Sequence, residues 1–446
     1  MTSLSLSFPA RYGHNVDMRL VRRVLDTDLT PERALSRLAT SATARGAAPP
    51  AALCGEWFGA RAVIAPSLEL TPVSDAAAAF AIPARQPEVA DAVPGAVGGG
   101  WFGYLSYDLA DPAKRSGALP PAVWGWADHV LRWDTDGRCW FEALVPVDAP
   151  DPLGLLSTVE SALATPGAGE TWSAGPMNRP LPSAHHQAVK SCVHEIEAGE
   201  LFQANICCRF TGTFAGSATA LFAEGVRRLA PRRAAHLAGD WGAVVSFSPE
   251  LFLARHGRSV RSTPIKGTLP RRGPADDGNA QRLRESTKDV AENVMITDLV
   301  RNDLGRVCAV GSVTVPDLLT VRPAPGVWHL ESTVEGELAR GLDDAGLLAA
   351  TFPPGSVTGA PKIRALDLIA GLEPDARGVY TGAIGCASPI AGLELNVAIR
   401  TFEIHRDTIA LGVGGGITAD SDAEAEWQEC LHKSAPLTKL LATPPR

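Results

Sequence analysis

Apolar and polar residues alternate along Leu201–Phe210, and this period of two predicts a β-strand. The polar face of the strand carries the side chains of Gln203, Asn205, Cys207 and Arg209. A strand face of this kind most often lies in solvent, but it can also line a cavity. The pattern alone leaves both interpretations open.

Helical spacing appears on both sides of this strand. Ser183 can cap a preceding helix whose apolar face is formed by Val189, Val193 and Ile196. Ala280–Asn302 predicts a longer helix, on which three ionisable residues share one stripe: Glu285, Lys288 and Glu292. Such a stripe is usually solvated and forms internal ion pairs. If Glu292 is buried instead, its carboxylate could bind a cation.

The last helix is predicted to begin at a capping box formed by Ser421 and Glu424. On this helix Glu426, Glu429 and Lys433 lie on one side. The sequence therefore predicts two helices that each offer at least one carboxylate.

Pro249–Arg271 predicts a hairpin. Glu250 opens an apolar run, Gly257 supplies the turn, and Ser259–Ile265 returns as a strand that ends at Lys266. The hairpin would bring the Glu250 carboxylate near the Lys266 amine. A lysine in such a turn is usually a surface residue, but a deprotonated lysine beside an ionisable partner can act as a nucleophile.

Further strands are predicted at 310–321, 326–338, 379–388 and 393–405, the last two as a hairpin that carries Tyr380 and Arg400. Between them, Pro353–Pro361 is a Gly/Ser/Thr loop that leads into a helix at Pro361. Backbone N–H groups at such a helix start suit an anion, although ordinary loop-to-helix joints share the same composition. Gly412–Gly416 allows a ligand or another backbone to approach closely.

Composition places the 446-residue chain among globular proteins, since 45% of its residues are hydrophobic. A net charge of −8 and a pI near 5.7 provide no basic surface for nucleic acid. Met1–Tyr12 lacks the basic and apolar regions of a signal peptide, and no apolar run is long enough to span a bilayer, so we expect a cytoplasmic protein with no membrane or nucleic-acid partner. The eight cysteines contain no C-x-x-C pair and are expected to be reduced thiols.

The best linker candidate is Ala164–Pro182, which is rich in Ala, Gly and Pro. We therefore divide the chain into an N-terminal region, residues 1–165, and a catalytic region, residues 183–442. Short strands with a few helices are expected before the linker, and the two regions could still share one sheet system.

Several ordered segments closely resemble the chorismate-utilising enzyme family. They are PIKGT, KDVAENVMITDLVRNDLGRV, PPGSVTGAPKIRA, YTGAIG and GVGGGITADSDAEAEWQE, and together they cover most of Ser183–Lys439. GWFGYLSYDL, at Gly100–Leu109, extends the likeness toward the N-terminus. The resemblance implies an α+β fold like that of anthranilate synthase component I, a sandwich of two antiparallel β-sheets flanked by helices.

The resemblance also implies a set of ligand-binding residues. Mg²⁺ would be held by the carboxylates of Glu292 and Glu429, with Glu426 nearby, and would bind the ring carboxylate of chorismate. Substrate contacts are expected from Gln203, His329, Thr358, Tyr380, Thr381, Arg400, Gly415, Gly416 and Lys433. Among these, Tyr380 and Arg400 would hold the enolpyruvyl carboxylate, assisted by the N–H groups of Gly415 and Gly416.

Two positions distinguish members of the family. Members that add water to chorismate have a lysine base where this chain has Gln203, so the nucleophile is expected to be ammonia. A lysine at the position of Lys266 is characteristic of aminodeoxychorismate synthases. The resemblance therefore implies that Lys266 attacks C2, that ammonia then adds at C4, and that Glu250 acts as general acid and base.

Ammonia would come from glutamine through a separate glutamine amidotransferase subunit. None of the cysteines lies in the Gly-x-Cys-x-Gly turn of the class I glutaminases; the nearest candidate, Gly385-Cys386-Ala387, lacks both the spacing and the second glycine. The product would feed p-aminobenzoate and folate or a related specialised pathway. The alternatives are an anthranilate synthase component I, against which Lys266 argues, and a catalytically silent chorismate-binding homologue.

Overall fold

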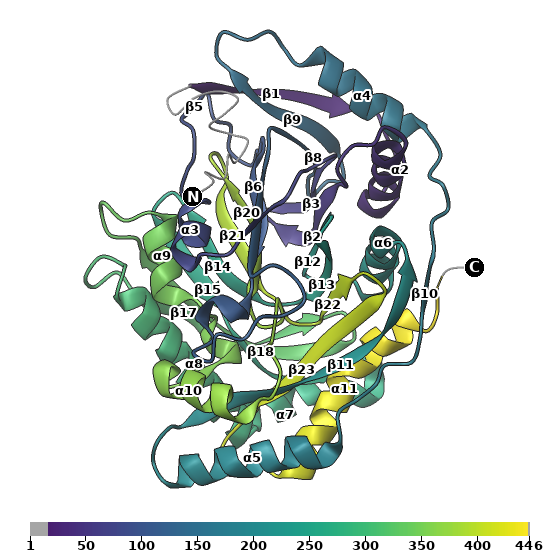
Figure 1. Ribbon diagram of the computed structural model, residues 1–446. Helices are drawn as coiled ribbons and strands as arrows, with labels where there is room; N and C mark the ends of the chain where they lie inside the picture. Colours follow the sequence, from purple (N-terminus) through teal and green to yellow (C-terminus); the bar gives the residue numbers. More distant parts are fainter. Residues whose placement is uncertain (1–16, 445–446) are drawn as a thin grey trace.

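The computed structural model describes residues 17–444, so Met1–Tyr12 lies outside the described residues. Two β-sheets pack face to face with helices on their outer surfaces (Figure 1). Every named strand pair in this part of the chain is antiparallel except the pair formed by β1 and β5. The predicted α+β sandwich is confirmed.

The first sheet has 13 strands within residues 17–444. Their order is β10 (Trp172–Ala174), β11 (Gln203–Gly216), β23 (Thr408–Ile417), β22 (Thr401–His405), β13 (Gly242–Ser248), β12 (Arg233–Gly239), β2 (Ala51–Trp57), β3 (Ala60–Ala65), β8 (His129–Trp133), β9 (Cys139–Pro146), β1 (Met18–Leu25) and β5 (Val89–Ala90), with β19 (Gly359–Ala360) also paired to β11.

The second sheet has 10 strands in the same described part of the chain. Their order is β16 (Ile265–Pro270), β18 (Val327–Glu337), β15 (Ser259–Thr263), β14 (Leu251–His256), β21 (Gly392–Val397), β20 (Ala383–Ser388), β6 (Gly100–Leu105), β7 (Ala122–Ala127) and β4 (Thr71–Val73), with β17 (Thr314–Ala324) also paired to β18. Both sheets therefore contain strands from before and after the 164–182 segment.

The helices cover the outer faces of the two sheets. They are α2 (Pro31–Ala44), α3 (Ala76–Ala81), α4 (Leu153–Ala164), α5 (Pro182–Glu197), α6 (Ala218–Leu229), α7 (Asn279–Glu285), α8 (Thr287–Gly305), α9 (Asp344–Thr351), α10 (Lys362–Leu372) and α11 (Ala423–Leu441). One apolar cluster lies between the sheets and includes Leu53, Phe102, Tyr104, Leu237 and Ile384. No helix in residues 17–444 has the length and apolar character needed to cross a membrane.

Several predicted elements appear as expected, while others break at specific residues. The strand at Gln203 and the hairpins β14–β15 and β20–β21 are present. The predicted helix 280–302 is instead two helices, because the Ser286 hydroxyl accepts the Asp289 N–H and caps a new helix, α8. The predicted strand 393–405 breaks near Arg400, which has a φ of 52°, and the chain passes there from the second sheet to the first.

Two predicted helix caps are wrong, and one strand starts later than expected. Helix α5 begins after Leu181 without a side-chain cap, so Ser183 is already helical. The cap of α11 is Asp422, which accepts the Ala425 N–H, whereas the Ser421 hydroxyl turns to Glu426. The strand predicted from residue 310 begins at Thr314.

Candidate active site

Three functional groups from three elements meet above Gly416 of β23. A β-carbon at this position would lie 2.1 Å from Gln203 Nε2, 3.1 Å from Lys266 Nζ and 3.2 Å from Glu292 Oε2. Glycine leaves this space to the three side chains, which belong to β11, β16 and α8 respectively. The polar face predicted for β11 therefore lines a site rather than facing solvent, and Glu292 is buried.

Lys266 occupies an irregular part of its strand. The pairing of β16 with β18 shifts register between Ile265 and Thr268, and Lys266 lies in this shift. Its Nζ is 3.9 Å from Glu292 Oε2, and its side chain is 10% exposed. Glu292 also accepts a hydrogen bond of 3.5 Å from Gln203 Nε2, while Gln203 Oε1 is buried without a partner in residues 17–444. The amine and the amide thus face a common space and retain capacity for a ligand.

The Glu250 carboxyl lies just before β14 and is almost fully buried. Burial raises its pKa from 4.5 to about 7, even though the Ser356 hydroxyl, the Lys266 charge and the Ile265 N–H favour the ionised form. A carboxyl with this pKa can donate and accept a proton near neutral pH. The Lys266 charge thus acts on the Glu250 carboxyl, and the two side chains are neighbours, as the predicted hairpin implies.

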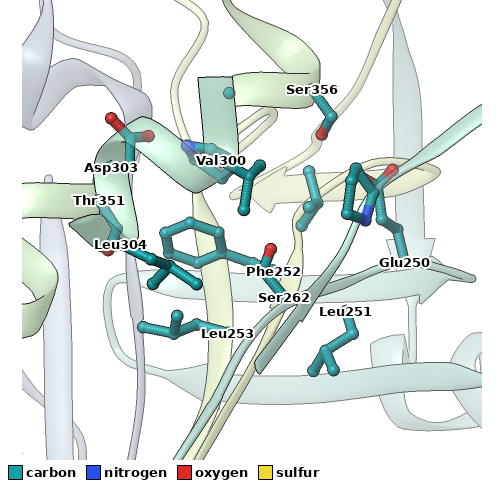
Figure 2. Close-up of a pocket in the computed structure, with 14 residues that line it drawn as sticks. Glu250, Leu251, Phe252, Leu253, Ser262, Val300, Asp303, Leu304, Thr351 and Ser356 are labelled. Atoms are coloured by element: carbon teal, nitrogen blue, oxygen red, sulfur yellow. The ribbon is translucent and has the colours of Figure 1, made fainter. Parts of the chain in front are cut away.

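A cavity of about 20 Å³ lies beside Glu250. Figure 2 shows Glu250 and Ser356 on one side of it and Asp303 and Thr351 on the other, with apolar side chains such as Val300 between them. Apolar walls exclude water from the carboxyl, which explains its high pKa.

His329 has one buried ring nitrogen without a hydrogen-bond partner in the described part of the chain. Burial, with Arg400 and Arg232 nearby, lowers the pKa of His329 to about 3, so its imidazole is neutral. Its Nδ1 lies 2.9 Å from Thr268 Oγ1, and its buried Nε2 has no partner among the described residues.

Within residues 17–444, the Arg400 guanidinium forms no ion pair or side-chain hydrogen bond, and Glu250 is the carboxyl that acts on its charge. Burial lowers its pKa, while the neighbouring Glu250 opposes this shift. A guanidinium that forms no ion pair within residues 17–444 is suited to bind an anionic ligand.

Three carboxylates and three lysines surround Gly415 and Gly416, which lie near the end of strand β23. A β-carbon at Gly415 would lie 3.1 Å from Glu426 Oε2 and 3.6 Å from Glu429 Oε1. Each acid has a lysine partner, and the pairs are Lys266–Glu292 at 3.9 Å, Lys288–Glu426 at 3.1 Å and Lys433–Glu429 at 2.6 Å. The lysines balance the negative charge of the group.

The carboxylates fit a magnesium ion in part. Among residues 17–444, no three His, Cys, Asp or Glu side chains already surround one point closely enough to hold a metal. However, Mg²⁺ commonly uses one or two protein carboxylates and fills its shell with water and substrate oxygens. Among the described residues, Glu426 Oε2 is buried without a partner and offers such a ligand near Gly415, next to Glu429. Magnesium binding stays a prediction.

Four predicted substrate contacts are engaged within the protein. The Thr358 hydroxyl donates to Pro354 O, and the Thr381 hydroxyl donates to Tyr380 O. Lys433 donates to Gly414 O and pairs with Glu429. The Tyr380 hydroxyl lies 3.9 Å from Cys207 Sγ, and no contact joins Tyr380 to Arg400 in the described chain.

Sequence reasoning missed several supporting residues. Ser356 binds the Glu250 carboxylate, Thr268 orients His329, and Lys288 pairs with Glu426. Ser356 lies in the Pro353–Pro361 loop, whose composition indicates exposed backbone N–H groups but gives no sign of a hydroxyl that binds Glu250. The short side chains of Ser and Thr gave no signal of their own.

Residues 54–439 match the family model described as chorismate binding enzyme. The chain belongs to this family. It is 38% identical to aminodeoxychorismate synthase component 1 of Klebsiella aerogenes over 348 residues, which cover 75% of each protein. It is 42% identical to the protein of the same name from Escherichia coli over 248 residues, which cover 55% of each chain. It is 35% identical to anthranilate synthase component 1 of Streptomyces coelicolor over 367 residues, which cover 75% of this chain and 71% of the relative.

Solved structures in the family share the fold. Anthranilate synthase component I of Streptococcus pneumoniae superposes with a TM-score of 0.71 at 25% identity, covering 81% of this chain and 85% of the other. The menaquinone-specific isochorismate synthase of Escherichia coli gives a TM-score of 0.74 at 20% identity, with coverage of 96% and 95%. These family members carry different names, so the activity has to be argued from the site.

Proposed function

We propose that this chorismate-utilising enzyme is the aminating component of an aminodeoxychorismate synthase, which converts chorismate and ammonia to 4-amino-4-deoxychorismate and water. The observation that carries the proposal is the Lys266 amine, held above Gly416 between Gln203 and Glu292 and beside the Glu250 carboxyl. Relatives named aminodeoxychorismate synthase component 1 support it.

Lys266 and Glu250 would divide the chemistry between them. After Lys266 has lost a proton to solvent, its amine attacks C2 of the ring, the double bond shifts, and the C4 hydroxyl leaves as water with a proton from Glu250. Ammonia then attacks C4, the double bond shifts back, and the C2–lysine bond breaks to restore the amine. The Glu250 carboxylate accepts the proton that the ammonia loses, so a pKa of about 7 suits both steps.

The remaining groups would position a dianionic substrate. Arg400 is suited to the enolpyruvyl carboxylate because its guanidinium forms no ion pair in the described residues. His329 Nε2 can hydrogen-bond a neighbouring oxygen. Glu292, Glu426 and Glu429 would hold Mg²⁺. When bound, this ion would neutralise the ring carboxylate and fix the orientation of the ring.

Gln203 would help to select ammonia as the nucleophile. Its amide cannot remove a proton from water, and its free Oε1 can instead accept a hydrogen bond from an N–H donor such as ammonia. The ammonia would come from a glutamine amidotransferase partner, in keeping with the component 1 names of the relatives.

The second candidate is the anthranilate synthase reaction, in which ammonia attacks C2 directly. Relatives named anthranilate synthase component 1 favour it, including one from Neisseria meningitidis that is 38% identical over 270 residues. Lys266 argues against it because its amine occupies the space from which ammonia would approach C2. A catalytically silent binding protein is disfavoured by the presence of Glu250, Lys266, Glu292 and Arg400 together.

Product analysis separates the three functions. Purified protein is incubated with chorismate, Mg²⁺ and ammonium at mildly alkaline pH, and the products are identified by mass and retention time. We expect 4-amino-4-deoxychorismate without pyruvate release. Anthranilate with equimolar pyruvate would replace the proposal with the second candidate, and unchanged chorismate that still binds the protein would support the silent homologue.

The partner is tested in the same assay. Ammonium salts should support turnover by the chain alone, while glutamine should do so only after a glutaminase subunit is added. Glutamine-dependent turnover by the isolated chain, free of contaminating glutaminase, would refute the need for a partner.

A further inference from the structure

The proposed reaction gives no role to the small cavity beside Glu250. Strand β14 lines it together with Ser262 and Pro264, and helices α8 and α9 and the loop that carries Ser356 complete its walls. Its volume of about 20 Å³ is too small for the ring of chorismate. It is sufficient for one molecule of the size of water or ammonia, which needs about 10–15 Å³. The cavity can therefore hold a small reactant but not the ring.

Polar side chains line this cavity among the apolar ones. Figure 2 shows Glu250 and Ser356 at one end and Asp303 and Thr351 at the other, and the buried Ser262 also belongs to the lining. Hydroxyl and carboxyl oxygens accept hydrogen bonds from N–H groups, and a hydroxyl can donate one to a nitrogen lone pair. Cavities that stay empty are apolar, whereas a cavity with several polar groups suits a small polar occupant.

The charges around the cavity favour a neutral occupant. At one end, Asp303 Oδ2 accepts a hydrogen bond from Lys362 Nζ at 2.5 Å, so this carboxylate is already paired. At the other end, burial disfavours a charge on Glu250 and raises its pKa to about 7. An ion that enters such a site loses its hydration without gaining a free counter-ion. Ammonia therefore suits the cavity better than ammonium does.

The position of the cavity matches the step that consumes ammonia. In the proposed mechanism the Glu250 carboxylate accepts a proton from the ammonia that attacks C4, so the nucleophile has to come within hydrogen-bonding distance of this group. Glu250 is itself part of the cavity wall, and so is Pro264, which lies two residues before Lys266 in the chain. A molecule held in the cavity is thus next to the base that the attack requires.

We propose that this cavity is the ammonia-binding site of the enzyme, in which one neutral ammonia molecule is held beside Glu250 before it attacks C4. The hydroxyls of Ser262 and Ser356 would bind the ammonia through hydrogen bonds, and the side chain of Val300 would limit the size of the nucleophile. The inference rests on the proposed function, because that function makes ammonia the second substrate.

Two substitutions of Val300 test the site in opposite directions, with ammonia and the larger methylamine as nucleophiles at saturating chorismate. Val300→Ile narrows the cavity and should raise the KM for ammonia by roughly 10-fold or more, while the Lys266 adduct still forms without ammonia. Val300→Ala widens the cavity and should raise kcat/KM for methylamine relative to ammonia by roughly 10–100-fold, with 4-methylamino-4-deoxychorismate identified by mass. Val334 belongs to the same apolar cluster but does not line the cavity, so Val334→Ala and Val334→Ile should keep the wild-type values.

The ammonia site is refuted if both Val300 variants keep the wild-type KM for ammonia and the wild-type preference over methylamine, or if the Val334 variants change these values equally. Product identity reports separately on the proposed function. Anthranilate from the wild-type protein would refute that function, whereas 4-amino-4-deoxychorismate with unchanged nucleophile preference in folded Val300 variants would refute the ammonia site alone. Circular dichroism confirms folding, and if Val300→Ile does not fold, the methylamine measurement on Val300→Ala decides.

Discussion

Buried charged groups in this molecule fall into two kinds, and the Glu394 network and the Glu250 site represent them. Between the sheets, the Glu394 carboxylate accepts from Arg233 at 2.8 Å and from the Phe58 N–H at 3.0 Å, and pairs with His256 at 3.2 Å. These partners lower its pKa despite its burial. Glu250 is equally buried but has fewer charged partners, and its pKa rises to about 7.

The same contrast separates two lysines. Lys362 donates to Asp303 at 2.5 Å, to Thr351 O at 2.8 Å and to Pro353 O at 3.0 Å, so every proton of its ammonium group is used. Within residues 17–444, Lys266 forms one ion pair, the 3.9 Å contact with Glu292, and no hydrogen bond. A buried charged group whose hydrogen-bonding capacity is fully used within the protein stabilises the fold. A buried charged group with unused hydrogen-bonding capacity can bind a ligand.

The largest expected effect comes from the two lysines. Lys266→Arg should lower kcat by roughly 10⁴-fold, because a guanidinium stays protonated and cannot attack C2. Lys266→Ala should redirect any remaining ammonia addition to C2 and yield the 2-amino isomer. The free energy of unfolding should change little in both variants.

Lys362→Met is the matched control for these variants. It should leave Asp303 as a buried unpaired carboxylate and lower the free energy of unfolding by roughly 3–5 kcal/mol. The kcat of the protein that remains folded should stay close to the wild-type value. If Lys266→Arg retains near wild-type kcat, the distinction between the two lysines is lost. Urea unfolding and steady-state rates provide both readouts.

Glu250 and Glu394 should differ as the two lysines do, with Glu250 affecting kcat and Glu394 affecting stability. Glu250→Gln should lower kcat by roughly 10²–10³-fold because the amide can neither donate nor accept the proton at C4. The wild-type pH profile should show an ionisation near pH 7 that this variant lacks. Glu394→Gln should keep the pH profile while lowering stability. Equal kcat losses in the two variants would contradict the comparison.

Stability should respond to pH with opposite sign at the two sites. Folded Glu250 holds its proton up to about pH 7 and the unfolded chain only to about 4.5, so its contribution to stability is present below pH 4.5 and is lost as pH rises through 7. Each unit of pKa difference between the folded and unfolded states corresponds to about 1.4 kcal/mol. The free energy of unfolding of Glu250→Gln, relative to wild type, should therefore be roughly 3 kcal/mol higher at pH 8 than at pH 4. The pKa of Glu394 is lowered in the folded protein, so its contribution to the free energy of unfolding is present above the pKa of the unfolded chain and is lost toward acid pH. Glu394→Gln should lack this contribution. Denaturant unfolding at both pH values measures these differences.

The smallest effects concern the acidic group near Gly415. Glu292→Gln and Glu429→Gln should raise the Mg²⁺ concentration needed for half-maximal activity by roughly 10–100-fold, with chorismate binding weakened in parallel. Isothermal titration with Mg²⁺ in the presence of chorismate gives a readout independent of turnover. Full activity in excess EDTA would show that these carboxylates serve another purpose.

Local sequence patterns predicted the elements that carry the site. Period-two alternation placed Gln203 on a polar face, and helical spacing put Glu426 and Glu429 on one side of α11. Patterns of this kind are local, and they could not show that the chain changes sheets near Arg400 or that α8 starts anew at Ser286. The crossing depends on pairing between strands that are distant in sequence, and the break depends on one hydroxyl.

The hydrogen-bond partners of the site residues were less predictable than the elements that carry them. Ser356 reaches Glu250 from a loop about a hundred residues away in the chain, and Thr268 meets His329 only because β16 pairs with β18. The Tyr380 hydroxyl lies 3.9 Å from Cys207 Sγ, a contact that no local pattern indicates. The family resemblance supplied the roles of these residues, whereas their hydrogen bonds follow from the packing of the two sheets.

Trapping the covalent intermediate tests the central claim most directly. The protein is mixed with chorismate and Mg²⁺ without ammonia, quenched in acid, digested and analysed by mass spectrometry, with Lys362 as the internal comparison. The account predicts that the peptide with Lys266 gains the mass of chorismate less one water, and that added ammonium removes the adduct as 4-amino-4-deoxychorismate forms. An unmodified Lys266 peptide under conditions in which the same sample turns over with ammonium would contradict the role of this amine as the nucleophile.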